Sequence, residues 1–205
     1  MGYPSSKRAG IAGFALLALN GAAQAQQSGG PLSSLLKSKS DSVCFRRDYD
    51  AAHLKRHPGQ MTEAITLSFR GDGVRIELKQ KDRKAPRYIG ASCDWSEKAG
   101  RDVQDRRLIP AFKKASGYDC IVIVSPSSAE EGGYAIIDPA RDGQSLMLYI
   151  DDPVVVQDGL GKDDRALSFK LGREDRQFQL TRADAALCKP MDDKLELPYT
   201  RNLKE

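Results

Sequence analysis

The sequence predicts an all-β domain, mainly antiparallel, built as a single disulfide-bonded barrel or sandwich of about eight strands with one long charged loop. Three observations lead to this fold class. Apolar residues recur at every second position in several short runs, which is typical of half-buried strands. Short turn sequences rich in glycine and aspartate separate these runs. Four cysteines accompany an export signal, and disulfides persist in the oxidising compartments that receive exported chains.

The N-terminal residues have the composition of a secretory signal. MGYPSSKR carries two basic residues, an uncharged apolar run occupies residues 9–19, and an A-x-A site precedes Gln26. The apolar run is too short to cross a bilayer, which needs about 20 residues. We therefore expect residues 1–25 to be a signal peptide. The mature protein is expected to be soluble and periplasmic or secreted, without a membrane span.

Length and charge limit the function classes. Of the 205 residues, 180 remain after cleavage, enough for one domain with a sizeable core. The formal net charge of +4 falls to +2 when the two basic residues of the signal are removed. Nucleic-acid-binding domains usually have a larger and clustered basic excess, so nucleic acid is not an expected partner.

The mature chain is expected to begin with a flexible leader. Residues 26–41 are rich in serine, glycine and lysine, a composition that does not bury enough apolar surface to become ordered. The β-domain is expected to span residues 42–188, followed by a C-terminal tail at residues 189–205. Its first strand is VCFRRDY, residues 43–49.

A β-hairpin is predicted next. Two alternating runs flank the turn signal GDG at residues 71–73. The alternation assigns the following side chains to the core face: Ile65, Leu67, Phe69, Val74, Ile76 and Leu78.

Further alternating runs continue along the chain, and the turn signals PARDGQ and GRED separate the last two pairs. They are RYIGASC (87–93), DCIVIVS (119–125), YAIID (134–138), SLMLYID (145–151), ALSFKL (166–171) and RQFQL (176–180). In the last two runs, Leu167, Phe169, Leu171, Phe178 and Leu180 are expected to point inward. The charged segment at residues 94–118 fits neither a helical nor a strand period, and it is predicted to be the long surface loop.

The four cysteines are expected to form structural disulfides. No C-x-x-C spacing suggests a redox motif or a zinc site, and three pairings are open from the sequence alone. The preferred pairing joins Cys44 to Cys188, at the two ends of the domain. It also joins Cys93 to Cys120, which closes the charged segment.

His53 and His57, the two histidines of the chain, stand at an i, i+4 spacing in YDAAHLKRHP. A zincin would need H-E-x-x-H, but Leu54 follows the first histidine, and two basic residues lie between the pair. Pro58 restricts the backbone of His57 and disfavours stacking of the two rings. We therefore expect a solvent-facing turn and assign no metal ligand, cofactor site or catalytic residue.

Three other motifs are incomplete. GASCD around Ser92 lacks the second glycine of a nucleophile elbow, and GLGKDD at residues 159–164 lacks the Ser or Thr of a P-loop. The acidic residues at 151–164 lack EF-hand spacing, which leaves an irregular calcium site as the alternative to an acidic loop.

Two basic stretches could form one surface. Together they could present cations to an acidic envelope polymer, a lipid phosphate or an acidic protein. The two stretches are KQKDRKAPR, residues 79–87, and FRRDYDAAHLKRH, residues 45–57. The alternative is that both are solvated ends of hairpins, where lysine discourages aggregation at sheet edges.

The chain has CFRRDYDAAHLKRHP after a signal, then a middle region with cysteines, and RQFQLTRADAALC near the end. In the order of these segments, it resembles a group of small uncharacterised secreted or periplasmic bacterial β-proteins with paired cysteines. The resemblance covers most of the mature domain and implies no activity or catalytic residue. The expected function is binding of an envelope ligand or partner protein. The alternative is a periplasmic hydrolase or metal-binding protein whose site residues converge only in the fold.

Overall fold

The computed structural model describes residues 29–38, 41–71, 73–99, 112, 116–124, 131–160 and 166–195. The predicted signal peptide, residues 1–25, lies outside the described residues, as does most of the charged segment between residues 100 and 115. The strands are β1 (Val43–Asp48), β2 (Thr62–Arg70), β3 (Gly73–Gln80), β4 (Arg87–Ser96), β5 (Gly117–Ile123), β6 (Glu131–Pro139), β7 (Ser145–Ile150), β8 (Val154–Gln157), β9 (Ala166–Phe169) and β10 (Gln177–Ala183). The helices are the 3-10 helices η1 (Ser33–Leu35) and η2 (Ala185–Leu187) and the α-helices α1 (Ala51–Arg56) and α2 (Lys189–Lys194).

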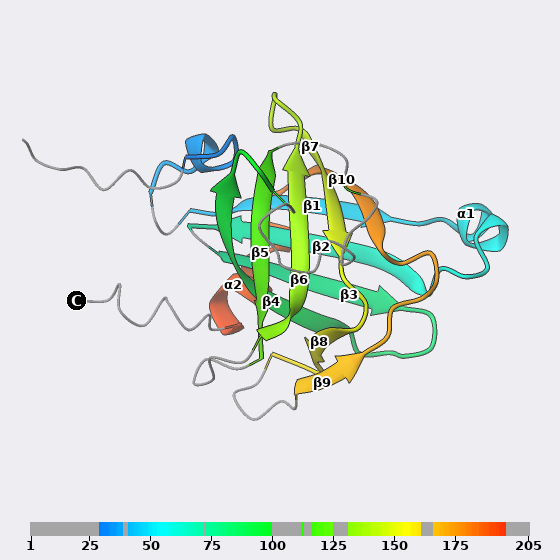
Figure 1. Cartoon of the computed structure of the whole chain (residues 1–205). Coiled ribbons are helices and arrows are strands. Elements are labelled where there is room, and N and C mark those ends of the chain that lie inside the picture. The colour runs from blue at the N-terminus through cyan, green and yellow to red at the C-terminus, as the bar shows by residue number, and fades with distance from the viewer. Residues whose placement is uncertain are drawn as a thin grey trace, which may run out of the picture.

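Eight of the strands close an antiparallel barrel (Figure 1). From β1 to β7 each strand pairs with the next along the chain, and β10 pairs with both β7 and β1 to complete the circle. In Figure 1, β1–β3 cross behind β5–β7. The predicted antiparallel all-β class is confirmed. Of the two expected architectures, barrel and sandwich, the chain adopts the barrel.

The strand directions define two ends of the barrel. The N-terminal end carries η1, the β2–β3 and β6–β7 turns and the segment after β10. The α1 end carries α1, the β3–β4 turn at residues 81–86 and the segment at residues 151–176. In Figure 1 the α1 end lies toward the lower right and the N-terminal end toward the upper left.

Side chains fill the barrel interior. One buried cluster draws residues from all eight barrel strands, and the predicted inward-facing set from Ile65 to Leu78 belongs to it. The aromatic residues Phe45, Phe69, Tyr118 and Phe178 are each at most 1% exposed. An eight-stranded barrel is just wide enough for side chains to occupy its interior. The barrel is therefore a packed core.

The strands β8 and β9 form a hairpin that was not foreseen. Residues 154–157 lie within the stretch interpreted as an acidic loop, yet Val154 and Val156 are each 1% exposed and pack in the barrel core at the α1 end. The hairpin joins the barrel through one β4–β8 pair, Tyr88 with Gln157. The two runs that flank the turn GRED do not pair with each other, because β9 pairs with β8, whereas β10 pairs with β7 and β1.

At the N-terminal end, residues expected in a flexible leader belong to the core. Leu32 is 0% exposed and lies in the main cluster. Its backbone N–H donates to the Tyr118 hydroxyl at 3.0 Å, and the N–H of Ser33 donates to the same oxygen at 3.3 Å. The segment thus covers the N-terminal end of the barrel, with its polar backbone groups bonded to a buried tyrosine.

Both disulfides of the preferred pairing are present. Cys44–Cys188 spans 144 residues and attaches the C-terminal segment to β1, whereas Cys93–Cys120 joins directly opposite residues of β4 and β5.

The first residues of the expected C-terminal tail also belong to the domain. Met191 in α2 and Leu195 are buried with the Cys44–Cys188 bridge on the outer face of the barrel. The guanidinium of the buried Arg75 donates from Nε to the Leu195 carbonyl at 2.8 Å. The segment through Leu195 therefore packs as part of the fold.

Candidate functional site

The helix α1 joins β1 to β2 and begins at a side-chain cap. The Asp50 carboxylate accepts the backbone N–H of His53 at 2.6 Å, and this hydrogen bond lowers the pKa of Asp50. The helix ends at Arg56, but the N–H of His57 still donates to the His53 carbonyl at 3.0 Å. Both histidines therefore remain on the same turn.

The two histidine rings stack on each other. Their centroids lie 4.4 Å apart with an interplanar angle of 24°, and the Tyr49 ring lies 4.7 Å from that of His53. The expectation that Pro58 disfavours stacking is wrong. His57 does leave helical geometry, with φ −119° and ψ 71°, but its hydrogen bond to His53 keeps the two rings within contact distance.

Neighbouring side chains orient both rings. The Gln60 amide donates to the Thr62 carbonyl at 2.8 Å, which turns the Gln60 oxygen toward Nε2 of His53 at 3.0 Å. Nδ1 of His57 lies 3.1 Å from the Glu174 carboxylate. Both partners are acceptors, so His53 carries a proton on Nε2 and His57 carries one on Nδ1. We refer to Tyr49, His53, His57, Gln60 and Glu174 as the histidine cluster.

A metal ion would have to use the other ring nitrogens, Nδ1 of His53 and Nε2 of His57, together with further ligands. Among the described residues, no group of three or more His, Cys, Asp or Glu side chains is placed to hold an ion. The cluster orders a turn, and one nitrogen of each ring bonds to a side chain of the chain itself.

A buried carboxylate ties this turn to the barrel. Asp175 is 0% exposed and accepts the backbone N–H of Met61 at 2.8 Å and that of Thr62 at 3.2 Å. Burial raises the pKa of Asp175, while these hydrogen bonds act in the opposite direction. A Cβ at Gly172 would lie 2.5 Å from the Asp175 carboxylate and 2.6 Å from the Gly59 carbonyl, so this contact requires glycine. Sequence reasoning identified the turn GRED but not the role of its last residue.

The acidic side chains at the α1 end are largely engaged in internal contacts. Asp158 accepts from Arg83 at 2.7 Å and lies 3.8 Å from Nε of Arg87. Asp152 is paired with Arg176 and accepts the backbone N–H of Leu171 at 3.1 Å. These carboxylates hold the β8–β9 hairpin and the following segment in place.

Arg87 is held on both sides of its guanidinium. The guanidinium lies 4.1 Å above the Phe169 ring and also bonds to Gln80. Desolvation of the guanidinium lowers the pKa of Arg87, and the positive charge of Arg83 lowers it further. This arginine therefore joins β4 to the β8–β9 hairpin.

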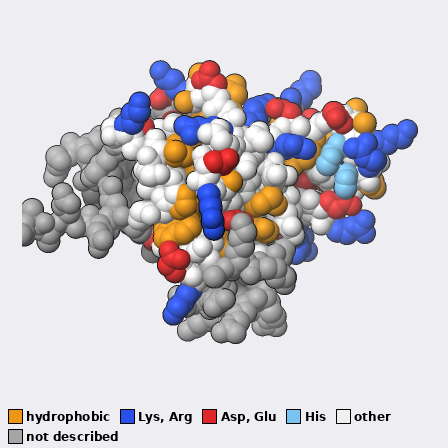
Figure 2. Space-filling model, turned by 90° about the horizontal axis from the view of Figure 1, so that it is seen from above, with side chains coloured by type: hydrophobic (Ala, Val, Ile, Leu, Met, Phe, Trp, Pro, Cys, Tyr) orange, Lys and Arg blue, Asp and Glu red, His pale blue; other side chains and the backbone are white. Residues whose placement is uncertain are grey.

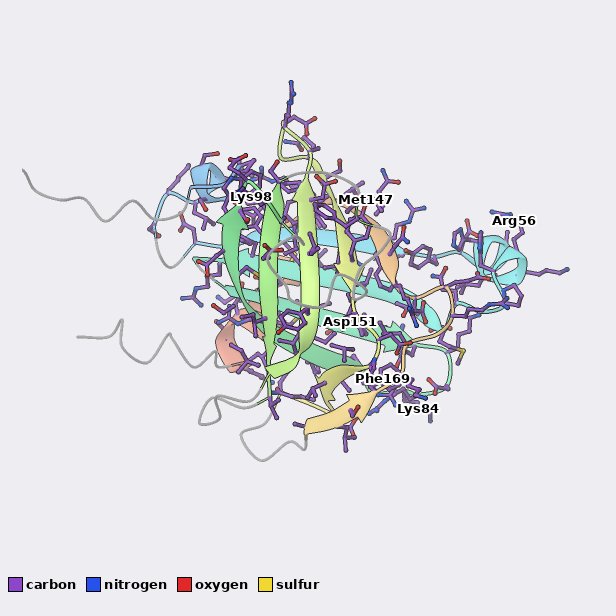
Figure 3. The ribbon with its side chains drawn as sticks, in the orientation of Figure 1. Arg56, Lys84, Lys98, Met147, Asp151 and Phe169 are labelled. Carbon is purple, nitrogen blue, oxygen red and sulfur yellow. A yellow bond between two sulfur atoms is a disulfide. The ribbon has the colours of Figure 1, made fainter. Side chains whose placement is uncertain are left out.

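The two basic stretches lie at the same end of the barrel. Arg56 at the end of α1 and Lys84 in the β3–β4 turn lie on the outer margin of the same end of the barrel (Figure 3). The backbone N–H of Lys81 donates to the Met61 carbonyl at 3.0 Å, which joins the two connections directly.

Ser92 and the histidines lie apart in the fold. Ser92 is opposite Gly73 and Ile121 in the barrel wall, toward the N-terminal end, whereas the histidine cluster is at the α1 end. Of the acidic residues considered for calcium, Asp151, Asp152 and Asp158 are described. Asp163, Asp164 and the Gly161–Lys162 pair lie outside the described residues.

Comparison with models of protein families, with curated proteins and with solved structures finds no match for this chain. Among the helices of the described ranges, none is long and apolar enough to span a membrane.

Proposed function

We propose that the chain is an exported, envelope-associated binding domain that recognises its partner on the outer surface of the barrel. The filled interior is the observation that carries this proposal. Side chains from all eight barrel strands occupy the space in which an open barrel would hold a small ligand. Leu32 and Val154 fill its two opposite ends. With the interior occupied, recognition falls to the outer surface.

The cysteine chemistry supports export. All four cysteines are in disulfides, and such bonds form and persist in oxidising compartments. The proposed partner is therefore a component of the cell envelope or of the extracellular surface.

A periplasmic hydrolase is the rival function. Acyl transfer needs a nucleophile within hydrogen-bonding reach of a histidine base. The separation of Ser92 from His53 and His57 favours binding over hydrolysis that depends on this serine.

Retention of the mature, oxidised protein by isolated envelope fractions tests the proposal. We expect saturable binding that is lost when both disulfides are reduced and alkylated, because the outer surface depends on the folded barrel. We also expect no turnover of ester, peptide or phosphoester substrates. Lack of saturable binding would contradict the proposal, and turnover abolished by His53→Ala or His57→Ala would establish the hydrolase.

A further inference from the structure

The two ends of the barrel expose different charges. Among the described residues, the exposed acidic residues of the α1 end are Asp48, Asp50 and Asp82, and Asp48 is paired with Arg46; the others described there are buried or partly buried in contacts. Figure 2 shows lysine and arginine side chains around the pale-blue histidines on the right. Among the described residues, the exposed cations of this end are Arg47, Lys55, Arg56, Lys79, Lys81, Lys84, Lys170, Arg173 and Arg176.

The described part of the N-terminal end is more evenly balanced. Its exposed charged residues are Lys37, Lys98, Arg141, Arg182, Lys189 and Lys194 against Asp94, Glu97, Asp142, Asp184 and Asp193. The cationic excess at the α1 end is thus a local feature of a chain whose overall charge is small. Such a one-sided distribution attracts anionic partners to one face.

The shape of the α1 end selects among anionic partners. In Figure 1, α1 projects beyond the strands as the outermost part of this end. A projecting surface can meet an extended flat partner with several cations at once, whereas a linear polyanion is held better in a groove. The flat anionic surface available to an exported protein is a lipid bilayer with exposed phosphates.

We infer that the α1 end docks on the surface of an anionic lipid bilayer, with Lys55, Arg56 and Arg173 facing the lipid phosphates. This inference rests on the proposed binding function and names its partner. Arg173 is well placed for the role because its side chain is 84% exposed, next to the Glu174 that bonds His57.

The histidine cluster makes this surface rigid. The Asp50 cap, the stack of His53 on His57 and the His57–Glu174 contact hold α1 against the segment that carries Arg173. Cations on a preorganised surface lose less conformational entropy on binding than cations on a flexible loop. The histidines are therefore positioning residues for the cationic surface.

The docking is electrostatic. Among the described residues, the exposed large apolar side chains are Ile121 and Leu187, and neither belongs to α1 or to the turns around it. Without an apolar residue to insert into the acyl region, attraction to the headgroups supplies the affinity. Binding should therefore be reversible and sensitive to salt, since the screening length falls from about 10 Å at 0.1 M to about 3 Å at 1 M ionic strength.

Co-sedimentation with lipid vesicles tests the inference. The mature, oxidised protein is expected to bind vesicles of phosphatidylglycerol and phosphatidylcholine and not vesicles of phosphatidylcholine alone. Charge reversal of two exposed cations, Lys55→Glu with Arg56→Glu, should weaken binding about tenfold or more, because each cation near such a surface contributes to the affinity. Lys81→Glu with Lys84→Glu should weaken it in the same direction.

The matched control is Lys98→Glu with Arg141→Glu, the same change of charge at the N-terminal end, which should leave vesicle binding unchanged. Melting curves of all variants establish that each is folded. Equal binding to neutral vesicles, equal loss in the control, or tighter binding to soluble polygalacturonate than to vesicles would overturn the inference. Envelope binding without binding to anionic vesicles would refute the bilayer as partner but retain the proposed function, whereas loss of both would refute both.

Discussion

The two ends of the barrel are closed by different chemistry. At the N-terminal end, Leu32 is buried in the core, and the Cys44–Cys188 bridge fixes the C-terminal segment. At the α1 end, besides the apolar β8, the closure depends on hydrogen bonds of Asp175 and on the histidine cluster. Stabilisation by disulfides and apolar burial is thus concentrated at one end, while the other presents a polar surface that is open to recognition.

The largest expected effect is on the N-terminal end. Replacing the disulfide by Cys44→Ala with Cys188→Ala should lower the free energy of unfolding by about 5 kcal/mol in the chain-entropy model, because the bridge spans 144 residues. Cys93→Ala with Cys120→Ala should cost about 3.5 kcal/mol for a separation of 27 residues. Denaturant unfolding of the two pairs measures the difference. The reverse order would contradict the assignment of the Cys44–Cys188 bridge as the stronger constraint.

Truncation of a core side chain tests the apolar contribution at the same end. Leu32→Ala should lower the free energy of unfolding by about 3 kcal/mol, since large-to-small changes of fully buried leucines cost this much. Ser34→Ala, at an exposed neighbour, is the control and should change it by less than about 0.5 kcal/mol. Equal stability of Leu32→Ala and wild type in urea would show that the N-terminal segment does not contribute to the core.

At the α1 end, one carboxylate should be the main stabilising group. Asp175→Ala leaves the partly buried N–H of Met61 and the buried N–H of Thr62 without their acceptor and should cost about 2 kcal/mol. Glu174→Ala, next to it and partly exposed, should cost less than about 1 kcal/mol. Thermal melts of both variants at neutral pH decide the point. A larger loss for Glu174→Ala would show that the histidine contact, and not Asp175, holds this end.

The smallest expected effect is that of the histidines on stability. His53→Ala with His57→Ala should lower the free energy of unfolding by less than about 1 kcal/mol, because the His57–Glu174 pair is partly exposed to solvent and ion pairs of this kind contribute little. Elemental analysis of protein purified without a histidine tag should give the same result for the wild type and the variant. One equivalent of zinc in the wild type that is lost in the variant would show that the pair is a metal site.

The sequence predicted the strands better than their partners. Alternation from Ile65 to Leu78 identified the β2–β3 hairpin because a period of two marks a strand with one buried face. The same alternation could not tell that Phe169 lies in a strand paired with β8, because periodicity assigns a face and not a neighbour. Val154 and Val156 were missed because a four-residue strand between acidic residues has too few positions to show a period.

The candidate site was only partly accessible from sequence. The residues of both basic stretches were recognised, but not that pairing of β2 with β3 places Lys81 beside Met61, which brings the turn after β3 next to the connection after β1. Asp175 could not be distinguished from a solvated turn residue, because the partners of its carboxylate, Met61 and Thr62, lie more than a hundred residues earlier in the chain. The burial of Leu32 could not be predicted, because the serine and glycine around it are typical of flexible segments.

Hydrogen exchange of the mature, oxidised protein with and without anionic vesicles tests most directly the claim that recognition and stabilisation lie at opposite ends. Backbone amides exchange more slowly where bound vesicles cover them. We predict added protection in α1 and the β3–β4 turn, residues 51–61 and 81–86, and in residues 170–176. We predict no change at residues 29–38 and 140–144. Protection at the N-terminal end, or equal protection at both ends, would contradict the account.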